Sequence, residues 1–287
     1  KKKKKKREKK NLKDNEGDEN YHIYSSSFNG AEEKDLTPYP NVVVYPADYL
    51  KDVQDEILIQ MNKEDATVFD VYKLNVKTGE TKLVAKNPGN IGGWLTDSNG
   101  QVRLALETDG VVGTILYRET EEDEFKPFIS IDAGDTVSPL GFSKDNQFIY
   151  ALSNKGRDKI ELVKYDLKGN EEVIFSNPNV DVLGAAYNLE KDQILYALYE
   201  TDKYNFEFFD SEFETIFNEI KDKLGVDESE FWINDHNKEM TKFIVGVSSD
   251  TVYGKYYYYD LETDTMTPLA ELGSWIDSNN LAEMHSV

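Results

Sequence analysis

The chain has 287 residues with 33 basic and 55 acidic side chains, no cysteine, and 39% hydrophobic residues. This length accommodates one large or two ordinary domains. The 12% of aromatic residues supply large side chains for a core and argue against wholesale disorder. The absence of cysteine excludes disulfides, thiolate metal sites and a cysteine nucleophile. It fits a reducing compartment, and we expect a soluble, cytoplasmic protein.

The charge is unevenly distributed along the chain. Residues 1–10 (KKKKKKREKK) hold nine cations and one acid, a net charge of +8, whereas the other 277 residues hold 24 bases and 54 acids, a net charge of −30. We assign residues 1–11 to a basic disordered tail and residues 12–287 to one folded domain. Because an acidic body repels polyphosphates and anionic lipids, we expect no nucleic-acid partner and no membrane partner.

Two kinds of targeting segment are not recognisable in the sequence. No apolar run approaches the roughly 18–20 residues that a membrane span needs. The basic tail is not followed by the apolar segment of a secretory signal.

A tyrosine-rich strand, a polar turn and a second short strand recur along the chain, which indicates an internal repeat. The turns lie near Gly30, Gly79, Asp123, Gly169, Glu212 and Asp264, with spacings of 49, 44, 46, 43 and 52 residues. A further strand pair precedes several of these hairpins, as in residues 141–166, 185–210 and 237–260. Each repeat is therefore expected to be a four-stranded antiparallel meander.

A period of about 45–50 residues is typical of propeller blades. The sequence predicts an all-β fold, a β-propeller with about six four-stranded blades. A β-sandwich also contains regular short strands, but it does not require such a repeat, so the propeller is favoured.

One segment departs from the strand pattern. Residues 210–225 (DSEFETIFNEIKDKLG) carry apolar side chains at helical spacing, and Gly225 is a natural stop. Ser211 is the expected N-cap, with Glu214 completing a capping box. We expect a short helix over 211–224 that packs on the flank of the propeller; docking of a partner is the alternative function for it.

No motif for catalysis, cofactor binding or metal binding is recognisable. The sequence lacks G-x-S-x-G, the phosphate-binding G-x-x-x-x-G-K-[ST] and G-x-G-x-x-G. The glycine-rich stretch 87–94 (NPGNIGGW) is better explained as a turn into a strand. We therefore assign no catalytic residue, no cofactor-binding residue, no cofactor and no metal ligand.

Histidines and acidic turns are the remaining candidates for metal sites. His22, His236 and His285 lie far apart in the sequence and lack zinc-binding spacing. The acidic stretches 15–20 (NEGDEN) and 97–100 (DSNG) do not meet the EF-hand calcium pattern. With 55 acids in the chain, any pair of carboxylates chosen for glycoside hydrolysis would be arbitrary.

The segments in series resemble a known family. LKDNEGDENYHIY (12–24), FDVYKLNVKTGE (69–80) and residues 139–167 are similar to successive blades of the N-terminal propeller in prolyl-oligopeptidase-family serine peptidases, the acylaminoacyl-peptidase and dipeptidyl-peptidase relatives. The resemblance covers about residues 12–287. In that family the propeller gates a hydrolase domain and admits short peptides, and a segment similar to LAEMHSV (281–287) precedes the hydrolase domain.

The chain also departs from the family pattern. The hydrolase domain that carries the family's catalytic serine, aspartate and histidine has no counterpart here, so His285 is not the triad histidine. The family's propeller has seven or eight blades, which suggests that blades are missing on the N-terminal side. The double-glutamate helix of the dipeptidyl relatives is not recognisable, although Glu19 and Glu64 are candidates to face a channel.

The resemblance implies a non-catalytic, substrate-gating propeller portion of a serine peptidase, whose partners are a hydrolase domain and short peptides. A free-standing propeller that serves as a protein-interaction scaffold and a degenerate gene fragment are the alternatives. Missing blades would leave β edges unpaired, and we therefore expect a tendency to self-associate.

Overall fold

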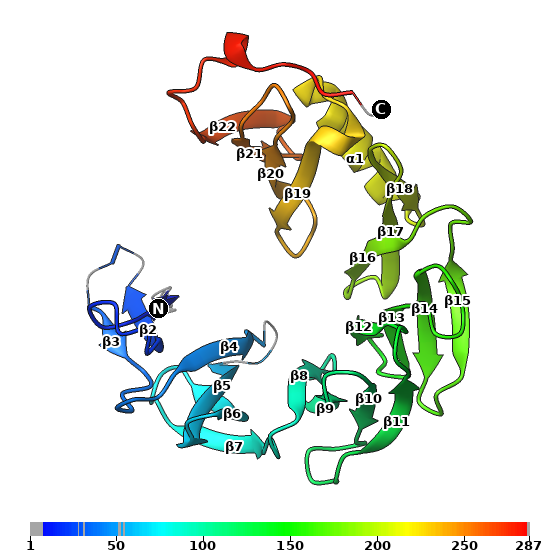
Figure 1. The fold of residues 1–287 in the computed structure, drawn as a ribbon. Coiled ribbons are helices and arrows are strands. Elements are labelled where there is room, and N and C mark those ends of the chain that lie inside the picture. Colours follow the sequence, from blue (N-terminus) through cyan, green and yellow to red (C-terminus); the bar gives the residue numbers. More distant parts are fainter. Residues whose placement is uncertain (1–7, 28, 31, 51–52, 54, 286–287) are drawn as a thin grey trace. The chain divides into compact units, whose positions relative to one another are not determined.

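A computed structural model describes residues 8–27, 29–30, 32–50, 53 and 55–285. Within them, 22 strands form six successive antiparallel sheets, each a meander of strands in chain order (Figure 1). We number these sheets as blades 1 to 6. The all-β fold and the six blades expected from the repeat are confirmed.

The chain divides into two compact units. Unit 1 comprises Lys1–Tyr150 and Tyr165–Asn170, and unit 2 comprises Ala151–Lys164 and Glu171–Val287. The strands of unit 1 that precede the boundary form blades 1 to 3: β1 (Glu8–Lys13), β2 (His22–Ser27) and β3 (Lys34–Asp35); β4 (Val44–Asp48), β5 (Glu56–Asp65), β6 (Val68–Asn75) and β7 (Thr81–Ala85); β8 (Ile91–Thr96), β9 (Val102–Thr108), β10 (Gly113–Tyr117) and β11 (Lys126–Ile131).

The boundary between the units passes through blade 4, and blades 5 and 6 belong to unit 2. The strands of these three blades are β12 (Val137–Phe142), β13 (Phe148–Ser153), β14 (Glu161–Asp166) and β15 (Glu171–Phe175); β16 (Val182–Asn188), β17 (Gln193–Glu200) and β18 (Tyr204–Phe208); β19 (Phe231–His236), β20 (Lys242–Val247), β21 (Lys255–Asp260) and β22 (Thr265–Glu271).

Apolar side chains on both faces of blade 2 pack against the neighbouring blades. Along β5, Ile57, Ile59 and Met61 enter one apolar cluster with Ile23 of blade 1, because alternate side chains point to the same face. Leu58 points to the other face and joins a second cluster with Val102 of blade 3. Both faces of the sheet are buried, and each such aliphatic side chain contributes about 1.5–3 kcal/mol by leaving water.

Turns between the first and second strands of a blade are braced by a polar side chain. In blade 3, the Oδ1 atom of Asp97 accepts the backbone N–H of Asn99 at 2.9 Å and of Gln101 at 3.0 Å. Gly100 has a φ of +74°, and a Cβ atom there would lie 2.6 Å from Leu50 Cδ2. The same bracing position is occupied in blades 4, 5 and 6 by Ser143, Asn188 and Asn237.

The helix expected over 211–224 is present as α1 (Ser211–Leu224), with Gly225 in the left-handed region as its C-cap. The predicted N-cap was wrong: Asp210 caps the helix, and its Oδ1 atom accepts the backbone N–H of Glu212 and of Phe213, both at 2.9 Å. The adjacent Asp210 is favoured because its carboxylate also interacts with the helix dipole. Two short 3-10 helices, η1 (Glu228–Glu230) and η2 (Ser278–Asn280), complete the described elements.

Two further details of the sequence prediction need correction. Glu212 lies in the first turn of α1 rather than in a strand turn, so blade 5 has three described strands and the chain enters the helix after β18. Blade 1 also has three described strands, and its β1 begins at Glu8, so residues 8–11 belong to a strand rather than to the expected tail. The rest of the expected tail, residues 1–7, lies outside the described residues.

Helix α1 buries its apolar stripe within unit 2. Phe213, Ile216, Phe217 and Ile220 are buried and share a cluster with Phe231 and other residues of blade 6. The ring centroids of Phe217 and Phe231 are 4.5 Å apart. The expected packing against a blade is confirmed. Among the described residues, no helix is long and apolar enough to cross a membrane.

Candidate functional site

The sequence segments considered for calcium or phosphate binding are turns whose polar atoms serve the backbone. Asp18 in segment 15–20 accepts the backbone N–H groups of Asn15 and Asn20, which lowers its pKa. In segment 87–94, Asn87 Oδ1 accepts the backbone N–H of Gly89 and leads into β8. The turn assigned to 87–94 is confirmed.

The three histidines occupy different surroundings. His22 Nδ1 lies 2.7 Å from Asp35 Oδ2 and joins β2 to β3, whereas His236 Nδ1 lies 2.9 Å from the carbonyl oxygen of Asn237. His285 lies in the terminal segment of unit 2. No group of three or more histidine or carboxylate side chains suited to hold a metal assembles among the described residues.

The two glutamates proposed to face a channel lie at separate points of unit 1. Glu19 is exposed in the turn between β1 and β2, and Glu64 is exposed on β5. The structure gives no hydrogen bond between them. Burial of the Tyr72 hydroxyl raises its pKa to about 12, and the negative charges of Asp70 and then of Glu64 add to this rise.

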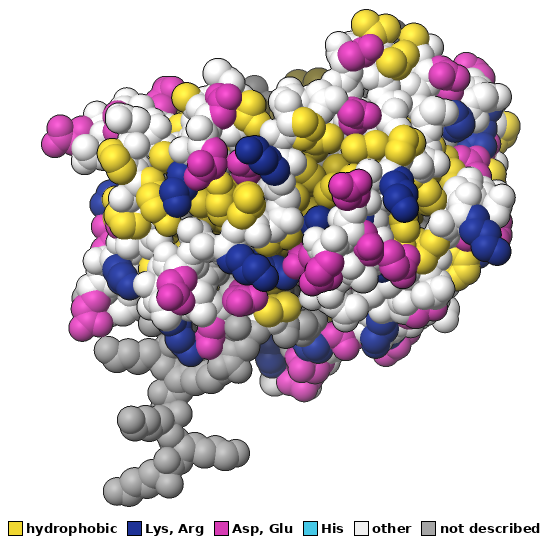
Figure 2. All heavy atoms as spheres, turned by 90° about the horizontal axis from the view of Figure 1, so that it is seen from below, with side chains coloured by type: hydrophobic (Ala, Val, Ile, Leu, Met, Phe, Trp, Pro, Cys, Tyr) yellow, Lys and Arg dark blue, Asp and Glu magenta, His cyan; other side chains and the backbone are white. Residues whose placement is uncertain are grey.

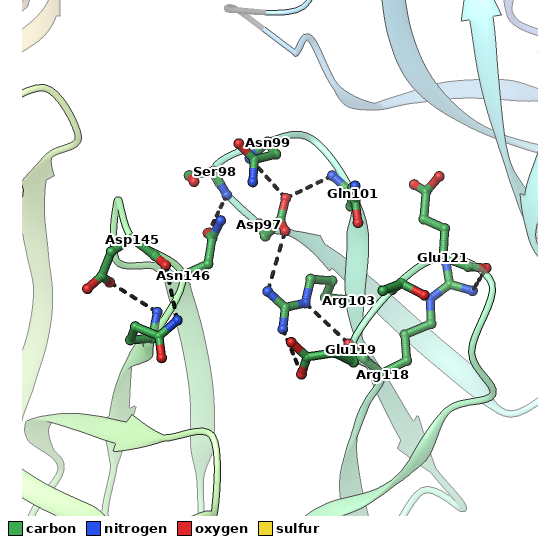
Figure 3. Close-up of polar contacts among 12 residues, drawn as sticks. Asp97, Ser98, Asn99, Gln101, Arg103, Arg118, Glu119, Glu121, Asp145 and Asn146 are labelled. Carbon is green, nitrogen blue, oxygen red and sulfur yellow. Dashed lines mark hydrogen bonds and ion pairs between the residues drawn. The ribbon is translucent and has the colours of Figure 1, made fainter.

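Unit 1 contains a buried arginine network at the junction of its blades (Figure 3). Arg103 on β9 is 5% exposed, and its Nη1 atom lies 3.5 Å from Asp97 Oδ2 at the end of β8. Its Nε atom donates to the carbonyl of Arg118 at 3.3 Å, and Nη2 donates to the Tyr117 hydroxyl. The guanidinium carbon also lies 5.3 Å from the ring centre of Phe142 in blade 4.

Arg118 is the second buried cation of this network. Its three donor nitrogens reach the carbonyl oxygens of Val102, Glu121 and Val84, the last of which belongs to blade 2. Burial lowers the pKa of Arg118. Both guanidinium groups are engaged in hydrogen bonds, ion pairs or ring contacts with neighbouring residues. We therefore assign the network to joining blades rather than to binding a ligand.

Sequence reasoning did not identify these arginines. The available signal was Arg103 inside the apolar run VRLAL (102–106), because a cation within such a strand must be paired or exposed. Its partners could not be found from sequence, since they depend on how β8, β9 and the β10–β11 turn meet.

Unit 2 contains an open cavity with a volume of about 820 Å³. It lies where the β17–β18 loop, the start of η1, the β20–β21 loop and the terminal segment come together. The β17–β18 and β20–β21 loops are the second connections of their blades. They lie at the same end of the strands, because every second connection of an antiparallel meander returns to that end. The carboxylates that line this cavity are Glu200, Asp202, Asp227, Glu230, Asp250 and Glu283.

The cavity is strongly acidic, with few compensating cations. Lys203 Nζ lies 3.2 Å from Asp227 Oδ2, and this contact raises the pKa of Lys203. Asp250 Oδ2 accepts the backbone N–H of Met284 at 2.5 Å, which holds the terminal segment at the rim. Such a cavity favours cationic groups over anionic ones. Because the acids are spread from residue 200 to residue 283, their proximity could not be predicted from the sequence.

Exposed apolar side chains recur on the first strands of the blades. In unit 1, Tyr45 lies on β4 and Leu140 on β12; in unit 2, Leu183 lies on β16 and Trp232 on β19. Leu183 and Trp232 are 47% and 42% exposed and each follows a buried residue that opens the strand. Single exposed apolar side chains are common on protein surfaces, so these four residues are candidates for ligand contacts and do not by themselves define a site.

Charges of both signs are dispersed over the face shown in Figure 2. Acidic side chains alternate with lysines and arginines, and apolar side chains appear between them. No continuous basic stripe of the kind that tracks a nucleic-acid backbone is visible among the described residues of that face.

The repeated four-stranded meanders define the fold as a β-propeller. Solved structures agree: a puromycin-hydrolyzing peptidase from Mycobacterium tuberculosis matches with a TM-score of 0.61 at 10% identity, over 92% of this chain and 43% of that chain. No family model matches the sequence.

Curated relatives are dipeptidyl peptidases. The dipeptidyl aminopeptidase BIII of Pseudoxanthomonas mexicana is 24% identical over 265 residues, which are 90% of this chain and 37% of the relative. The dipeptidyl peptidase family member 6 of Caenorhabditis elegans is 29% identical over 178 residues, which are 55% of this chain and 24% of the relative. The chain thus spans 37% and 24% of the lengths of these relatives, and its resemblance to the propeller portion of prolyl-oligopeptidase-family peptidases is confirmed.

Proposed function

We propose that this chain is the substrate-binding and gating propeller portion of a prolyl-oligopeptidase-like serine peptidase and that it is non-catalytic by itself. One observation carries the proposal: the similarity to a dipeptidyl aminopeptidase extends over 90% of this chain but only 37% of the relative. The chemistry of peptide hydrolysis is then supplied by a catalytic portion outside the matched region.

Two features of the structure support a role in binding peptides. The exposed apolar residues Leu183 and Trp232 of unit 2 lie on the first strands of their blades, and in propellers the blades surround a central channel. They would contact the side chains of a short peptide. The acidic cavity of unit 2 would attract its cationic groups.

Binding of short peptides to the purified chain tests this role. Fluorescence anisotropy of labelled peptides of four to ten residues would be compared for the native chain, for Leu183→Ala, for Trp232→Ala and for the matched control Val173→Ala. Val173 is 45% exposed, nearly the same as Leu183, but it lies on the last strand of blade 4.

The proposal predicts that Leu183→Ala and Trp232→Ala weaken peptide binding several-fold, because each removes an apolar contact, while Val173→Ala leaves it unchanged. Equal binding by all four proteins, or preferential binding of a folded protein over short peptides, would contradict a gating role and would favour an interaction scaffold instead.

A further inference from the structure

Blade 6 has a second face, opposite to the one that packs against helix α1. Along β20, Val245 and Val247 are buried in the apolar cluster that contains α1. Because side chains alternate along a strand, Gly246 between them belongs to the opposite face. The register pairs Gly246 with Trp232 of β19 on one side and with Tyr256 of β21 on the other (strands labelled in Figure 1). Residues paired across strands share a face, so a glycine lies between two aromatic side chains there.

The absence of a side chain at Gly246 lets two polar groups approach its backbone. A Cβ atom at this position would lie 2.9 Å from Trp232 Nε1 and 2.6 Å from Asn234 Oδ1. The indole N–H group and the amide of Asn234 therefore converge on one point above Gly246. Asn234 belongs to a β-bulge, since the register of β19 and β20 shifts between Ile233 and Asp235, and bulges redirect side chains. We call Trp232, Asn234 and Gly246 the indole–amide shelf.

Both polar groups of the indole–amide shelf are available to a ligand. Neither Trp232 Nε1 nor the side chain of Asn234 has a hydrogen-bond partner among the described residues. Trp232 is 42% exposed, and Asn234 is exposed as well. The indole N–H group is a donor only, whereas Asn234 Oδ1 is an acceptor. A peptide group presents the complementary pair, a carbonyl oxygen that accepts and an N–H group that donates.

The charges near the indole–amide shelf restrict the kind of ligand. No cation belongs to the shelf, and the exposed carboxylate of Asp235 directly follows Asn234. Phosphate and carboxylate groups are therefore disfavoured at this place. An uncharged ligand that carries a donor and an acceptor close together fits best, and the main chain of a peptide has this pair at every residue.

We propose that the indole–amide shelf holds a short peptide by its main chain. The Trp232 Nε1–H group donates to a peptide carbonyl, and Asn234 Oδ1 accepts a peptide N–H. This inference rests on the function proposed above and deepens it, because the contact does not depend on the side chains of the substrate. Gly246 is a positioning residue, since a side chain there would displace both polar groups. The shelf therefore accepts peptides of varied sequence whose main-chain N–H groups are free.

Binding of a matched pair of peptides to the full chain tests the proposal. The first is a fluorescein-labelled hexapeptide of alternating alanine and leucine. The second has methyl groups on its peptide nitrogens, which removes the N–H donors. Fluorescence anisotropy would be measured for the native chain and for Asn234→Leu, Trp232→Phe and Gly246→Ala. Asn179→Leu is the matched control, because Asn179 is exposed in the β15–β16 loop of unit 2 and its side chain also lacks a hydrogen bond among the described residues.

We expect the native chain to bind the unmethylated peptide about three- to tenfold more tightly than the methylated one, as the loss of a hydrogen bond implies. Asn234→Leu and Gly246→Ala should lose this preference. Trp232→Phe should weaken the binding of both peptides, because it removes the donor to the carbonyl and keeps an aromatic ring. Asn179→Leu should bind both peptides as the native chain does.

Equal affinity of the native chain for the two peptides, or an unchanged preference in Asn234→Leu and Gly246→Ala, would overturn the role of the shelf. If Leu183→Ala still weakens binding of the hexapeptide in that case, the proposed function stands without the shelf. Competition by cellohexaose, an uncharged oligosaccharide, would also overturn the inference, because the shelf would then recognise a sugar. Binding of neither peptide by the native chain would contradict both the shelf and the proposed function.

Discussion

The two units hold their blades together by different chemistry. In unit 1, polar side chains cross from blade to blade: Lys73 of blade 2 pairs with Glu121 of blade 3 at 2.9 Å, and Ser98 of blade 3 donates its backbone N–H to Asn146 of blade 4 at 2.9 Å. In unit 2, the cluster between blades 5 and 6 is aromatic and is centred on helix α1.

This difference reflects what fills the space beside each blade. Blade 5 has three described strands, and α1 supplies the apolar stripe that packs against blade 6. Blades 2 and 3 each have four strands, and two buried arginines of blade 3 reach its neighbours: Arg118 donates to the Val84 carbonyl of blade 2, and Arg103 lies over the Phe142 ring of blade 4. Apolar packing is tolerant of direction, whereas a buried charge network is not, so the two units should respond differently to substitution.

Removing the centre of the aromatic cluster has the largest expected effect. Phe217 is buried, with ring centroids of Phe206, Phe208 and Phe231 between 4.5 and 5.1 Å away. We expect Phe217→Ala to lower the free energy of unfolding by about 3–5 kcal/mol through lost burial and a cavity. Urea denaturation measures this loss. Glu214→Ala, on the exposed side of the same helix, is the control, with an expected change within about 0.5 kcal/mol.

Breaking the arginine network of unit 1 ranks second. Arg103→Met leaves the buried carboxylate of Asp97 without its cation, and we expect a loss of about 3 kcal/mol. Asp97 keeps its backbone donors, which limits the loss. Because the cost comes from an unpaired charge, the double variant Asp97→Asn with Arg103→Met should recover part of it. Lys77→Met, which breaks an exposed pair with Asp55, should cost no more than about 1 kcal/mol in the same denaturant titration.

A smaller effect is expected at the start of α1. Asp210→Ala removes the N-cap and should cost about 1–2 kcal/mol, whereas Asp210→Asn keeps a capping oxygen and loses only the ion pair with Lys191. Although burial tends to raise the pKa of Asp210, the Phe213 N–H and Lys191 lower it overall. A lowered folded pKa means that this stabilisation exists above pH of about 4 and disappears as the pH falls through the folded value.

Thermal melts between pH 2 and 7 separate these two contributions. The native protein should lose more stability on acidification than Asp210→Asn does. Parallel pH profiles for the two proteins would show that the carboxylate charge at this cap contributes nothing.

The smallest effect is expected at Tyr72, in the core between blades 1 and 2. Its hydroxyl is buried without a hydrogen-bond partner among the described residues, so Tyr72→Phe should be neutral or slightly stabilising near pH 7. Burial raises the Tyr72 pKa to about 12. A raised folded pKa gives stability that is complete below pH 10 and is lost as the pH rises toward 12.

Melting temperatures between pH 8 and 12 test this sign. The native protein should fall more steeply above pH 10 than Tyr72→Phe does. A substantial loss of stability for Tyr72→Phe at neutral pH would mean that the hydroxyl has a partner, such as a bound water.

The sequence predicted the parts of the fold that depend on local pattern. The turns at Gly30, Gly79 and Gly169, each with positive φ, carried the period that identified the blades. The hairpin turn predicted near Glu212 was wrong, because an acidic residue after an aromatic strand fits a strand turn as well as the first turn of a helix. The cap at Asp210 was missed because Ser211 and Glu214 also fit the capping pattern, and only the backbone geometry distinguishes them.

The parts that depend on long-range contacts could not be predicted in this way. The acidic cavity joins residues from 200 to 285, and the arginine network joins residues from Val84 to Phe142 of unit 1. Self-association through open β edges stays a prediction. The structure shows that the edge strands β4, β11 and β22 carry register shifts and the prolines Pro46, Pro127 and Pro268, features that act against pairing with another strand.

Labelling with a fluorophosphonate probe, which reacts with activated serine nucleophiles, tests the central claim most directly. The purified chain, residues 1–287, would be incubated with the probe beside an active serine peptidase as a positive control. If the chain is the binding portion and catalysis lies elsewhere, it should remain unlabelled and should not hydrolyse dipeptidyl substrates. Stoichiometric labelling of one serine, with matching hydrolysis, would contradict the account.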